Sequence, residues 1–391
     1  RAGEIFKYKG MAETLEELGR TNCESFYRGA IADAIDSYSR KTGGYLRKED
    51  LAAYKAQWVE PITTNYRGYD VWEIPPNGHG IVVLMALNIL EGMDLSAGHD
   101  DPETAHKIME ALKLAFTDGK RYVADPRAMK PTVEQLLSRD YAAKRRALIG
   151  STALEPKPGT PYCGDTVYLN AADGDGNMIS YIQSIYCGFG SGTVLPGTGI
   201  VFHNRGNNFT MDETMENCVA PGKKPYHTII PGFLSKDGKA VGPFGVMGAF
   251  MQPQGHVQVL TNMIDFHMNP QEALDAPRIQ WTGGKHIQLE REVPAHIAQD
   301  LDGSPASAFG QLIAHQLHIG RLHRRIGGLD AGRQALGLYE SQAFLLHALT
   351  SCPGPSAAAF SLAAPHWPPA PAPSPYRNWR EYGTGAARAP A

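Results

Sequence analysis

The first 150 residues carry apolar side chains at the spacing of amphipathic helices. Apolar residues recur about every 3.6 positions in several stretches, which places them on one face of a helix. This period predicts helices at residues 11–19, 24–38, 48–55, 104–122 and 133–148. The run from Gly80 to Leu90 is apolar except for Asn88 and is too short to span a bilayer, so we expect a buried helix there.

Strand-type patterns dominate the next part of the chain. Residues 61–74 are typical of two short strands around a turn, and residues 164–292 begin with strands and add helices at about 253–266 and 270–275. Because strands and helices fall into separate blocks, the pattern predicts an α+β fold. We expect two sheets packed between helical layers, an αββα sandwich.

One pair of strands surrounds a turn rich in Asp and Gly. Alternating apolar residues run from Thr166 to Ala172 and again from Met178 to Ser184, with the turn at residues 173–177 between them. Two such runs around an Asp/Gly turn predict a β-hairpin. With this loop, paired residue numbers sum to 350, so Thr166 is expected opposite Ser184.

A threonine hydroxyl is a weak nucleophile unless a base lies within hydrogen-bond reach. The threonine's own α-amino group can be that base, but only after the preceding peptide bond is cut. Here that bond joins Asp165 to Thr166. On the hairpin alone, an ordinary β-branched strand residue is the simpler interpretation of Thr166.

Further short motifs favour the catalytic interpretation of Thr166 over the ordinary strand residue. They follow one another as Pro75–Gly80, Leu87–Glu91, Ala115–Asp118, Ala124–Pro126, Gly164–Tyr168, Phe189–Gly192, Pro221–Pro225 and Asp275–Arg278. In their order and spacing, the chain from about Ile5 to Glu292 resembles the γ-glutamyltranspeptidase family. The resemblance implies a self-processing N-terminal nucleophile hydrolase with the αββα fold.

The resemblance also implies roles for residues around the hairpin. Thr166 matches the family's nucleophile, freed by self-cleavage after Asp165, and Ser184 matches a hydroxyl that hydrogen-bonds to it. Gly248 and Ala249 match a turn of two glycines whose N–H groups stabilise the oxyanion. If the second position needs a positive φ, the alanine strains the turn by roughly 1 kcal/mol or more.

The expected substrate-binding residues depart from the transpeptidases. Arg205 and Asn208 stand where those enzymes hold a γ-glutamyl head with a glutamine and an aspartate, and His227 and Thr228 replace a serine pair. An arginine offers a fork for a carboxylate, whereas an asparagine cannot neutralise an ammonium group. With Met251-Gln252-Pro253-Gln254, the pattern is similar to the branch that includes oxamate amidohydrolase. A surface ion pair for Arg205 and a hydrogen-bonded core position for His227 stay open as simpler interpretations.

Three parts of the chain are expected from composition and resemblance. Residues 1–165 correspond to the end of the large subunit, residues 166–300 to the small catalytic subunit, and residues 301–391 to an atypical tail. No valine follows Val293 and no lysine follows Lys285, while Pro and Ala accumulate. This tail indicates either disorder or a change of reading frame near residue 300. The resemblance places the start within the large subunit, without its opening strands, so we expect an incomplete enzyme.

Composition limits the partners that we expect. With 42% hydrophobic residues and a net charge of −3, the chain has no nucleic-acid footprint, and no apolar run is long enough for a membrane span. We expect no cofactor and no metal site. The expected partners are a small amide or γ-glutamyl substrate and the chain's own cleaved subunit. The two subunits would form an αβ heterodimer, and two such heterodimers could associate. Five scattered cysteines favour the cytoplasm, but a signal peptide would precede this sequence, so localisation is not readable from it.

These observations predict a self-processing amidohydrolase or acyltransferase with an N-terminal threonine. Two substrate classes compete: γ-glutamyl compounds such as glutathione, and small acidic amides such as oxamate. The alternative is a truncated or uncleaved family member without activity. Self-cleavage separates these, because an active chain gives two pieces and an inactive chain stays whole.

Overall fold

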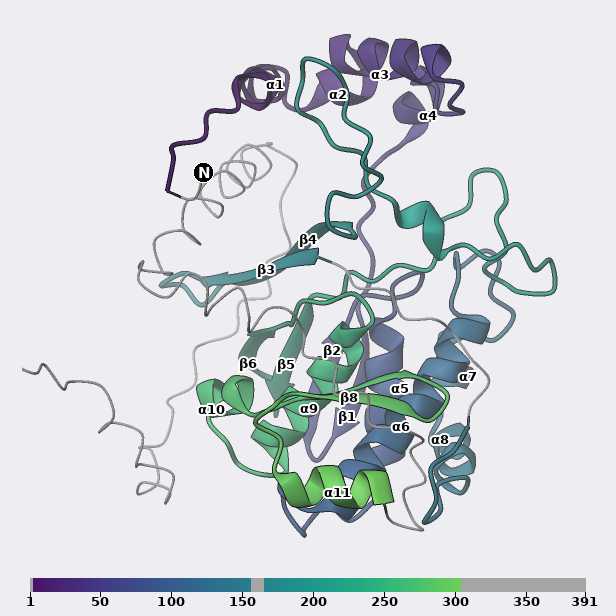
Figure 1. The fold of residues 1–391 in the computed structure, drawn as a ribbon, viewed down its shortest axis with the longest axis vertical. Coiled ribbons are helices and arrows are strands. Elements are labelled where there is room, and N and C mark those ends of the chain that lie inside the picture. The colour runs from purple at the N-terminus through teal and green to yellow at the C-terminus, as the bar shows by residue number, and fades with distance from the viewer. Residues whose placement is uncertain (1–2, 156–164, 304–391) are drawn as a thin grey trace, which may run out of the picture.

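The structure, a computed structural model, describes residues 3–155 and 165–303 (Figure 1). Residues 156–164, which include one of the five cysteines, and all of the predicted tail beyond residue 303 lie outside the described residues. The division of the chain into a large-subunit part, a small subunit and a tail therefore stays a prediction.

An antiparallel four-stranded sheet lies at the centre of the molecule. Its strand order is β1 (Ile62–Tyr66), β2 (Tyr69–Glu73), β5 (Gly232–Lys236) and β6 (Lys239–Phe244). Strands β1 and β2 are the two strands expected within residues 61–74. Because β2 pairs with β5, the sheet joins the two halves of the chain on either side of the hairpin.

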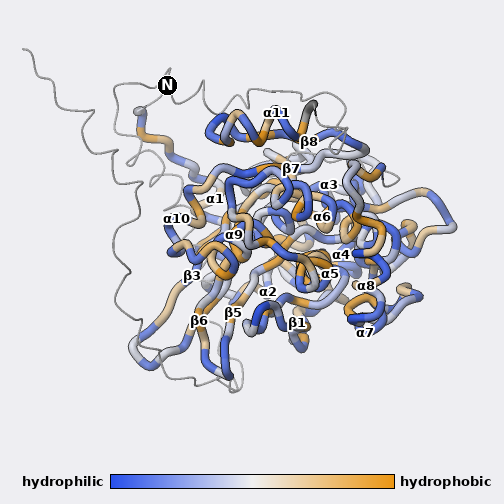
Figure 2. Tube along the Cα trace, turned by 90° about the horizontal axis from the view of Figure 1, so that it is seen from below, coloured by the Kyte–Doolittle hydropathy of each residue, from blue (hydrophilic) through white to orange (hydrophobic). Residues whose placement is uncertain are grey.

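Helices pack around α5 (Gly80–Leu90), which is buried along its whole length as its sequence predicted. Its neighbours include α6 (Pro102–Tyr122), α9 (Met251–Ile264) and strand β1. Figure 2 shows the hydrophobic colour concentrated along α5 in the middle of the molecule. Helix α6 begins at Pro102, where the Asp101 side chain accepts a hydrogen bond from the Thr104 N–H at 2.7 Å, a standard N-cap. No helix in the described part of the chain is long and apolar enough to cross a membrane.

Two of the predicted helices are interrupted. The stretch 24–38 forms α2 (Glu24–Arg28) and α3 (Ala30–Lys41), with Gly29 between them. A Cβ on Gly29 would lie 2.8 Å from the Cα of Ser25, so only glycine fits this close turn. The stretch 133–148 forms α7 (Val133–Leu136) and α8 (Arg139–Arg146), because the Ser138 hydroxyl caps a new helix by accepting from the Tyr141 N–H.

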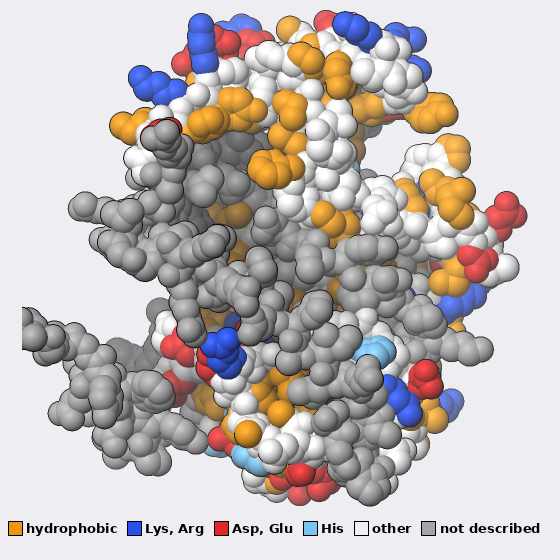
Figure 3. Space-filling view, in the orientation of Figure 1, with side chains coloured by type: hydrophobic (Ala, Val, Ile, Leu, Met, Phe, Trp, Pro, Cys, Tyr) orange, Lys and Arg blue, Asp and Glu red, His pale blue; other side chains and the backbone are white. Residues whose placement is uncertain are grey.

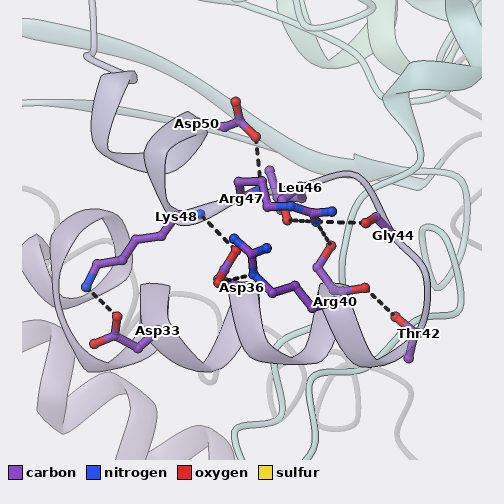
Figure 4. A network of polar contacts seen from close by, with 10 residues as sticks. Asp33, Asp36, Arg40, Thr42, Gly44, Leu46, Arg47, Lys48 and Asp50 are labelled. Carbon is purple, nitrogen blue, oxygen red and sulfur yellow. Dashed lines mark hydrogen bonds and ion pairs between the residues drawn. The ribbon is translucent and has the colours of Figure 1, made fainter.

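The first four helices form a lobe at one end of the molecule, with α1 at Lys9–Arg20 and α4 at Lys48–Ala53 (Figure 1). We call residues 3–59 the N-terminal lobe. The buried apolar cluster beneath it is small and combines Ile31 and Ile35 of the lobe with Leu195 from later in the chain. Figure 4 shows the polar network between α3 and α4, in which Asp36 binds Arg40 at 2.8 Å.

The remaining elements complete the opposite end of the molecule (Figure 1). They are α10 (Pro270–Asp275), the antiparallel pair β7 (Ile279–Gly283) and β8 (His286–Leu289), and α11 (Ala295–Gly303). A short 3₁₀ helix, η1 (Arg205–Asn208), lies between the hairpin and β5 in sequence.

The predicted hairpin is present as β3 (Asp165–Ala172) and β4 (Met178–Tyr186). The expected register holds from Val167, which pairs with Gln183, to Ala172, which pairs with Met178. It changes between Asp165 and Val167, so the direct pairing of Thr166 with Ser184 was wrong. Such a bulge re-aims the side chain at its position.

Candidate active site

Thr166 lies at the bulge of β3 with its side chain enclosed. The residue is only 7% exposed, and its Oγ1 accepts a hydrogen bond of 3.4 Å from Nε2 of Gln252. Gln252 is fully buried in the first turn of α9. The hydroxyl of the predicted nucleophile is therefore held in the interior by a neutral amide.

Ser184 belongs to a network that the sequence analysis did not predict. Its Oγ accepts from Nη2 of Arg205 at 2.8 Å, and Nη1 of the same guanidinium donates to Oγ1 of Thr228 at 3.1 Å. The Tyr186 N–H also donates to the Ser184 Oγ at 3.0 Å. Among the described residues, no hydrogen bond joins Ser184 to Thr166, so the proposed link between the two hydroxyls stays a prediction.

Arg205 is a buried cation that has no acidic partner in the described part of the chain. It is 5% exposed, and within the described ranges no carboxylate lies at ion-pair distance from it. Its guanidinium carbon lies 5.6 Å from the centre of the Tyr186 ring. Burial lowers the pKa of Arg205 to about 10. The surface ion pair considered from the sequence is therefore not what the structure shows, and the residue is placed to attract an anion.

The turn before α9 has the geometry that the sequence analysis allowed for. Gly248 has a φ of 116°, and Ala249 has a φ of 50° and is buried. An alanine in this left-handed region is strained by roughly 1 kcal/mol relative to glycine. The carbonyls of Gly248 and Ala249 accept from the N–H groups of Met251 and Gln252. These bonds fix the turn to the start of α9, the helix whose Gln252 side chain contacts Thr166.

His227 and Asn208, the other two expected substrate-binding residues, make contacts of their own. Burial, and then the charge of Arg205, lowers the pKa of His227 to about 3, so its ring is neutral at pH 7. Its Nδ1 accepts from the Ile229 N–H at 3.1 Å, a contact that fits the hydrogen-bonded core interpretation. Asn208 is partly buried and its carbonyl accepts from Asn217; in the described part of the chain its side-chain nitrogen has no partner.

A buried pair of titratable groups escaped the sequence analysis. Glu73 at the end of β2 and His256 in α9 are both fully buried, and Oε1 of the carboxyl lies 2.7 Å from Nδ1 of the ring. Burial raises the pKa of Glu73 above its ordinary value, whereas the nearby His256 opposes that shift. The only sequence signal was the adjacent Met251–Gln254 motif, since the two residues are 183 positions apart.

A metal centre requires several ligating side chains close together. Within residues 3–155 and 165–303, no group of three or more His, Cys, Asp or Glu side chains could hold a metal ion. What the arrangement offers is a buried hydroxyl, two backbone N–H groups in a strained turn and a buried guanidinium that is bound to hydroxyls and has no carboxylate partner among the described residues. These are elements of acyl-transfer chemistry.

The comparisons with known proteins define the class of this protein. A family model described as Gamma-glutamyltranspeptidase matches residues 1–323. The chain therefore belongs to the γ-glutamyltranspeptidase family, as the order of its motifs predicted.

Particular relatives add detail. The chain is 37% identical over 280 residues to the glutathione hydrolase-like YwrD proenzyme of Bacillus subtilis, covering 71% of this chain and 53% of the relative. It is 33% identical over 341 residues to the oxamate amidohydrolase proenzyme of Klebsiella pneumoniae, covering 85% and 64%. A crystal structure of cephalosporin acylase from Bacillus halodurans is 56% identical, with a TM-score of 0.74 over 80% of this chain and 57% of that chain.

These matches confirm the predicted fold class, because the described part of the chain shares the acylase's architecture. The relatives are named as hydrolases and acylases, and several are named as proenzymes. The chain spans about half the length of the first of these curated relatives.

Proposed function

We propose that this chain is part of a self-processing amidohydrolase whose nucleophile is Thr166. The observation that carries the proposal is the enclosure of the Thr166 hydroxyl beside a turn with two positive-φ residues, at the start of a hairpin strand. Cleavage of the Asp165–Thr166 bond frees the α-amino group that serves as base. The relatives named as proenzymes support a step of this kind.

The proposed reaction proceeds through an acyl-enzyme. The Thr166 oxygen bonds to the substrate carbonyl carbon while its proton passes to the α-amino group. The N–H groups of Gly248 and Ala249 bind the resulting oxyanion. The carbon–nitrogen bond then breaks, and the leaving amine takes the proton. Water or a second amine attacks the acyl-enzyme, which restores the threonine.

Arg205 favours a small amide with a carboxylate close to the scissile bond. Two of its nitrogens are held by the Ser184 and Thr228 hydroxyls, so the charge is fixed in place without being neutralised by the described residues. A carboxylate binding there gains a charge-assisted hydrogen bond in a site of low exposure. Similarity to an oxamate amidohydrolase supports this substrate class.

A γ-glutamyl substrate is the second candidate. It is favoured by the similarity to the glutathione hydrolase-like proenzyme, which has 37% identity. It is disfavoured by Asn208, because an amide cannot neutralise the ammonium group of a γ-glutamyl head. Only the small acidic amide requires the positive charge of Arg205, so a change at this residue separates the two candidates.

The test compares kcat/KM for oxamate and for a γ-glutamyl anilide, in the protein and in an Arg205→Gln variant. We expect the higher value with oxamate and a loss of about 2 to 5 kcal/mol of transition-state binding in the variant. Arg205→Lys, which keeps the charge without the fork, is expected to lose less. Comparable rates for the two substrates, or an unaffected Arg205→Gln variant, would support transpeptidase chemistry instead.

A further inference from the structure

Gln252 is a buried side chain whose amide oxygen has no hydrogen-bond partner among the described residues. Its Nε2 donates to Oγ1 of Thr166, and its Oε1 has no partner among the described residues although the side chain is fully buried. A buried amide oxygen without a partner costs about 1–3 kcal/mol. A donor that reached Oε1 would therefore remove this cost, and the described residues contain no such donor.

Self-cleavage creates such a donor. Asp165 and Thr166 are joined within β3, so the Thr166 nitrogen is a peptide nitrogen in this structure. After cleavage the same nitrogen becomes an amine with new hydrogens. The two terminal atoms of a primary amide lie side by side, as do the hydroxyl and the α-nitrogen of an N-terminal threonine. One amide can therefore donate to the hydroxyl and accept from the amine at the same time.

We propose that Gln252 is a positioning residue that holds the Thr166 hydroxyl before cleavage and, after it, accepts a hydrogen bond from the Thr166 α-amine through Oε1. This inference rests on the proposed function, since it takes Thr166 as the N-terminal nucleophile. In the mature enzyme, the amide aligns the amine with the hydroxyl whose proton it removes. The place of Gln252 in the first turn of α9 links this alignment to the oxyanion turn that precedes the helix.

The rigid mounting of Gln252 supports this role. The Gln252 N–H donates to the Ala249 carbonyl at 3.1 Å. One turn further along α9, His256 is bound to Glu73 of the central sheet. Phe244 packs on the His256 ring with centroids 4.8 Å apart, which ties the helix to β6 as well. The amide is thus carried by a helix that is fixed to two strands.

Other titratable or charged groups surround the same region. They are Glu73 of β2, His79 beside α5, Tyr168 of β3, Arg205 of η1, and His227 and His256. The charges of these groups all affect the pKa of the Thr166 amine. The test therefore compares pH profiles between variants that leave these groups unchanged.

The test is the pH dependence of kcat/KM in Gln252→Glu, Gln252→Met and a matched control, Gln258→Met. Gln258 lies on the same helix, and its amide bridges to the Ile279 backbone instead of reaching Thr166. The acid limb of the profile reports the base of the free enzyme. A carboxylate at position 252 favours the ammonium form, so we expect the limb to move up by roughly 1 to 3 pH units.

The methionine variant is expected to act in the opposite direction. It removes the acceptor that favours the charged amine, so the limb moves to lower pH, and kcat falls about 10-fold with KM nearly unchanged. Gln258→Met is expected to lower the melting temperature without moving the limb. Cleaved Gln252 variants whose limbs coincide with that of the wild type would overturn the proposal.

The outcomes also separate this inference from the proposed function. A new N-terminus at a residue other than Thr166 removes the proposed function itself. A correct N-terminus with unchanged limbs removes only the role of Gln252. If both Gln252 variants fold with melting temperatures close to that of Gln258→Met but stay uncleaved, Gln252 acts in the precursor alone, and its contact with the amine is wrong.

Discussion

The N-terminal lobe and the candidate active site treat polar groups in opposite ways. In the lobe, charged side chains pair along exposed helix surfaces, as Arg20 does with Glu17 and Arg28 with Glu24. At the site, Glu73, His256 and Gln252 are fully buried, and each has one polar atom without a partner among the described residues. Burying polar atoms without partners lowers the free energy of unfolding, whereas exposed ion pairs do not. This cost indicates that the buried groups at the site are kept for their chemistry and not for stability.

Apolar side chains also differ between the two regions, since the lobe exposes them and the core around the site buries them. The lobe exposes several large apolar side chains, and Figure 3 shows hydrophobic atoms gathered on its surface. Trp58 is 98% exposed and Tyr45 is 94% exposed. The core around the site instead buries the whole of α5. The lobe thus depends on a small cluster that it shares with Leu195, whereas the site is supported by the main core.

The largest effect is expected where the buried pair is broken. Glu73→Ala leaves His256 buried without its partner and is expected to cost about 3 to 5 kcal/mol of unfolding free energy. Replacing both residues, in Glu73→Leu/His256→Leu, is expected to be less damaging than the single change, because no polar group stays unpaired. Denaturant unfolding measures both. A double variant less stable than Glu73→Ala would show that the pair itself stabilises the fold.

A smaller effect, confined to the lobe, is expected from its core. Ile35→Ala removes a buried side chain that is 1% exposed and should cost about 2 to 5 kcal/mol locally. Hydrogen exchange should show faster exchange in α2 to α4, while amides of α5 keep their protection. Equal loss of protection in α5 would mean that the lobe and the site unfold as one unit.

The strained turn offers a gain instead of a loss. Ala249→Gly relieves the positive φ and should stabilise the protein by up to about 1 kcal/mol. The melting temperature measures this change, with Ala143→Gly in α8 as a control that should lose about 1 kcal/mol at an ordinary helical position. A lower melting temperature for Ala249→Gly would show that the turn does not strain the alanine.

The smallest effect is expected at the surface of the lobe. Arg40→Ala removes an exposed pair with Asp36 and should change the unfolding free energy by about 0.5 kcal/mol or less, less still in high salt. A loss above about 1.5 kcal/mol would indicate that the network in Figure 4 is a structural element of the lobe.

Local patterns predicted much of the fold, while contacts between distant segments were out of reach. The hairpin register from Val167 onward follows from the turn length, and the buried helix at Gly80–Leu90 follows from its composition. The bulge at Thr166 does not follow, because alternation of apolar residues carries no sign of a register shift. The break at Gly29 was missed because the close contact of Gly29 with Ser25 leaves no mark in the apolar periodicity.

The candidate site shows the same limit. The family resemblance pointed to Thr166, Arg205 and Thr228, and the structure places Arg205 and Thr228 in one network with Ser184. The absence of an acidic partner for Arg205 in the described ranges, and the pairing of Glu73 with His256, arise from segments far apart in sequence. Such pairs become visible only when the chain is folded.

The central claim is that Thr166 becomes the N-terminus of a catalytic subunit. The most direct measurement is amino-terminal sequencing, with intact mass, of the purified full-length protein and of its Thr166→Ala variant. The account predicts two pieces for the protein, the second beginning at Thr166, and a single uncut chain for the variant. A second piece that begins at any other residue, or a variant that is cut as the protein is, would contradict it.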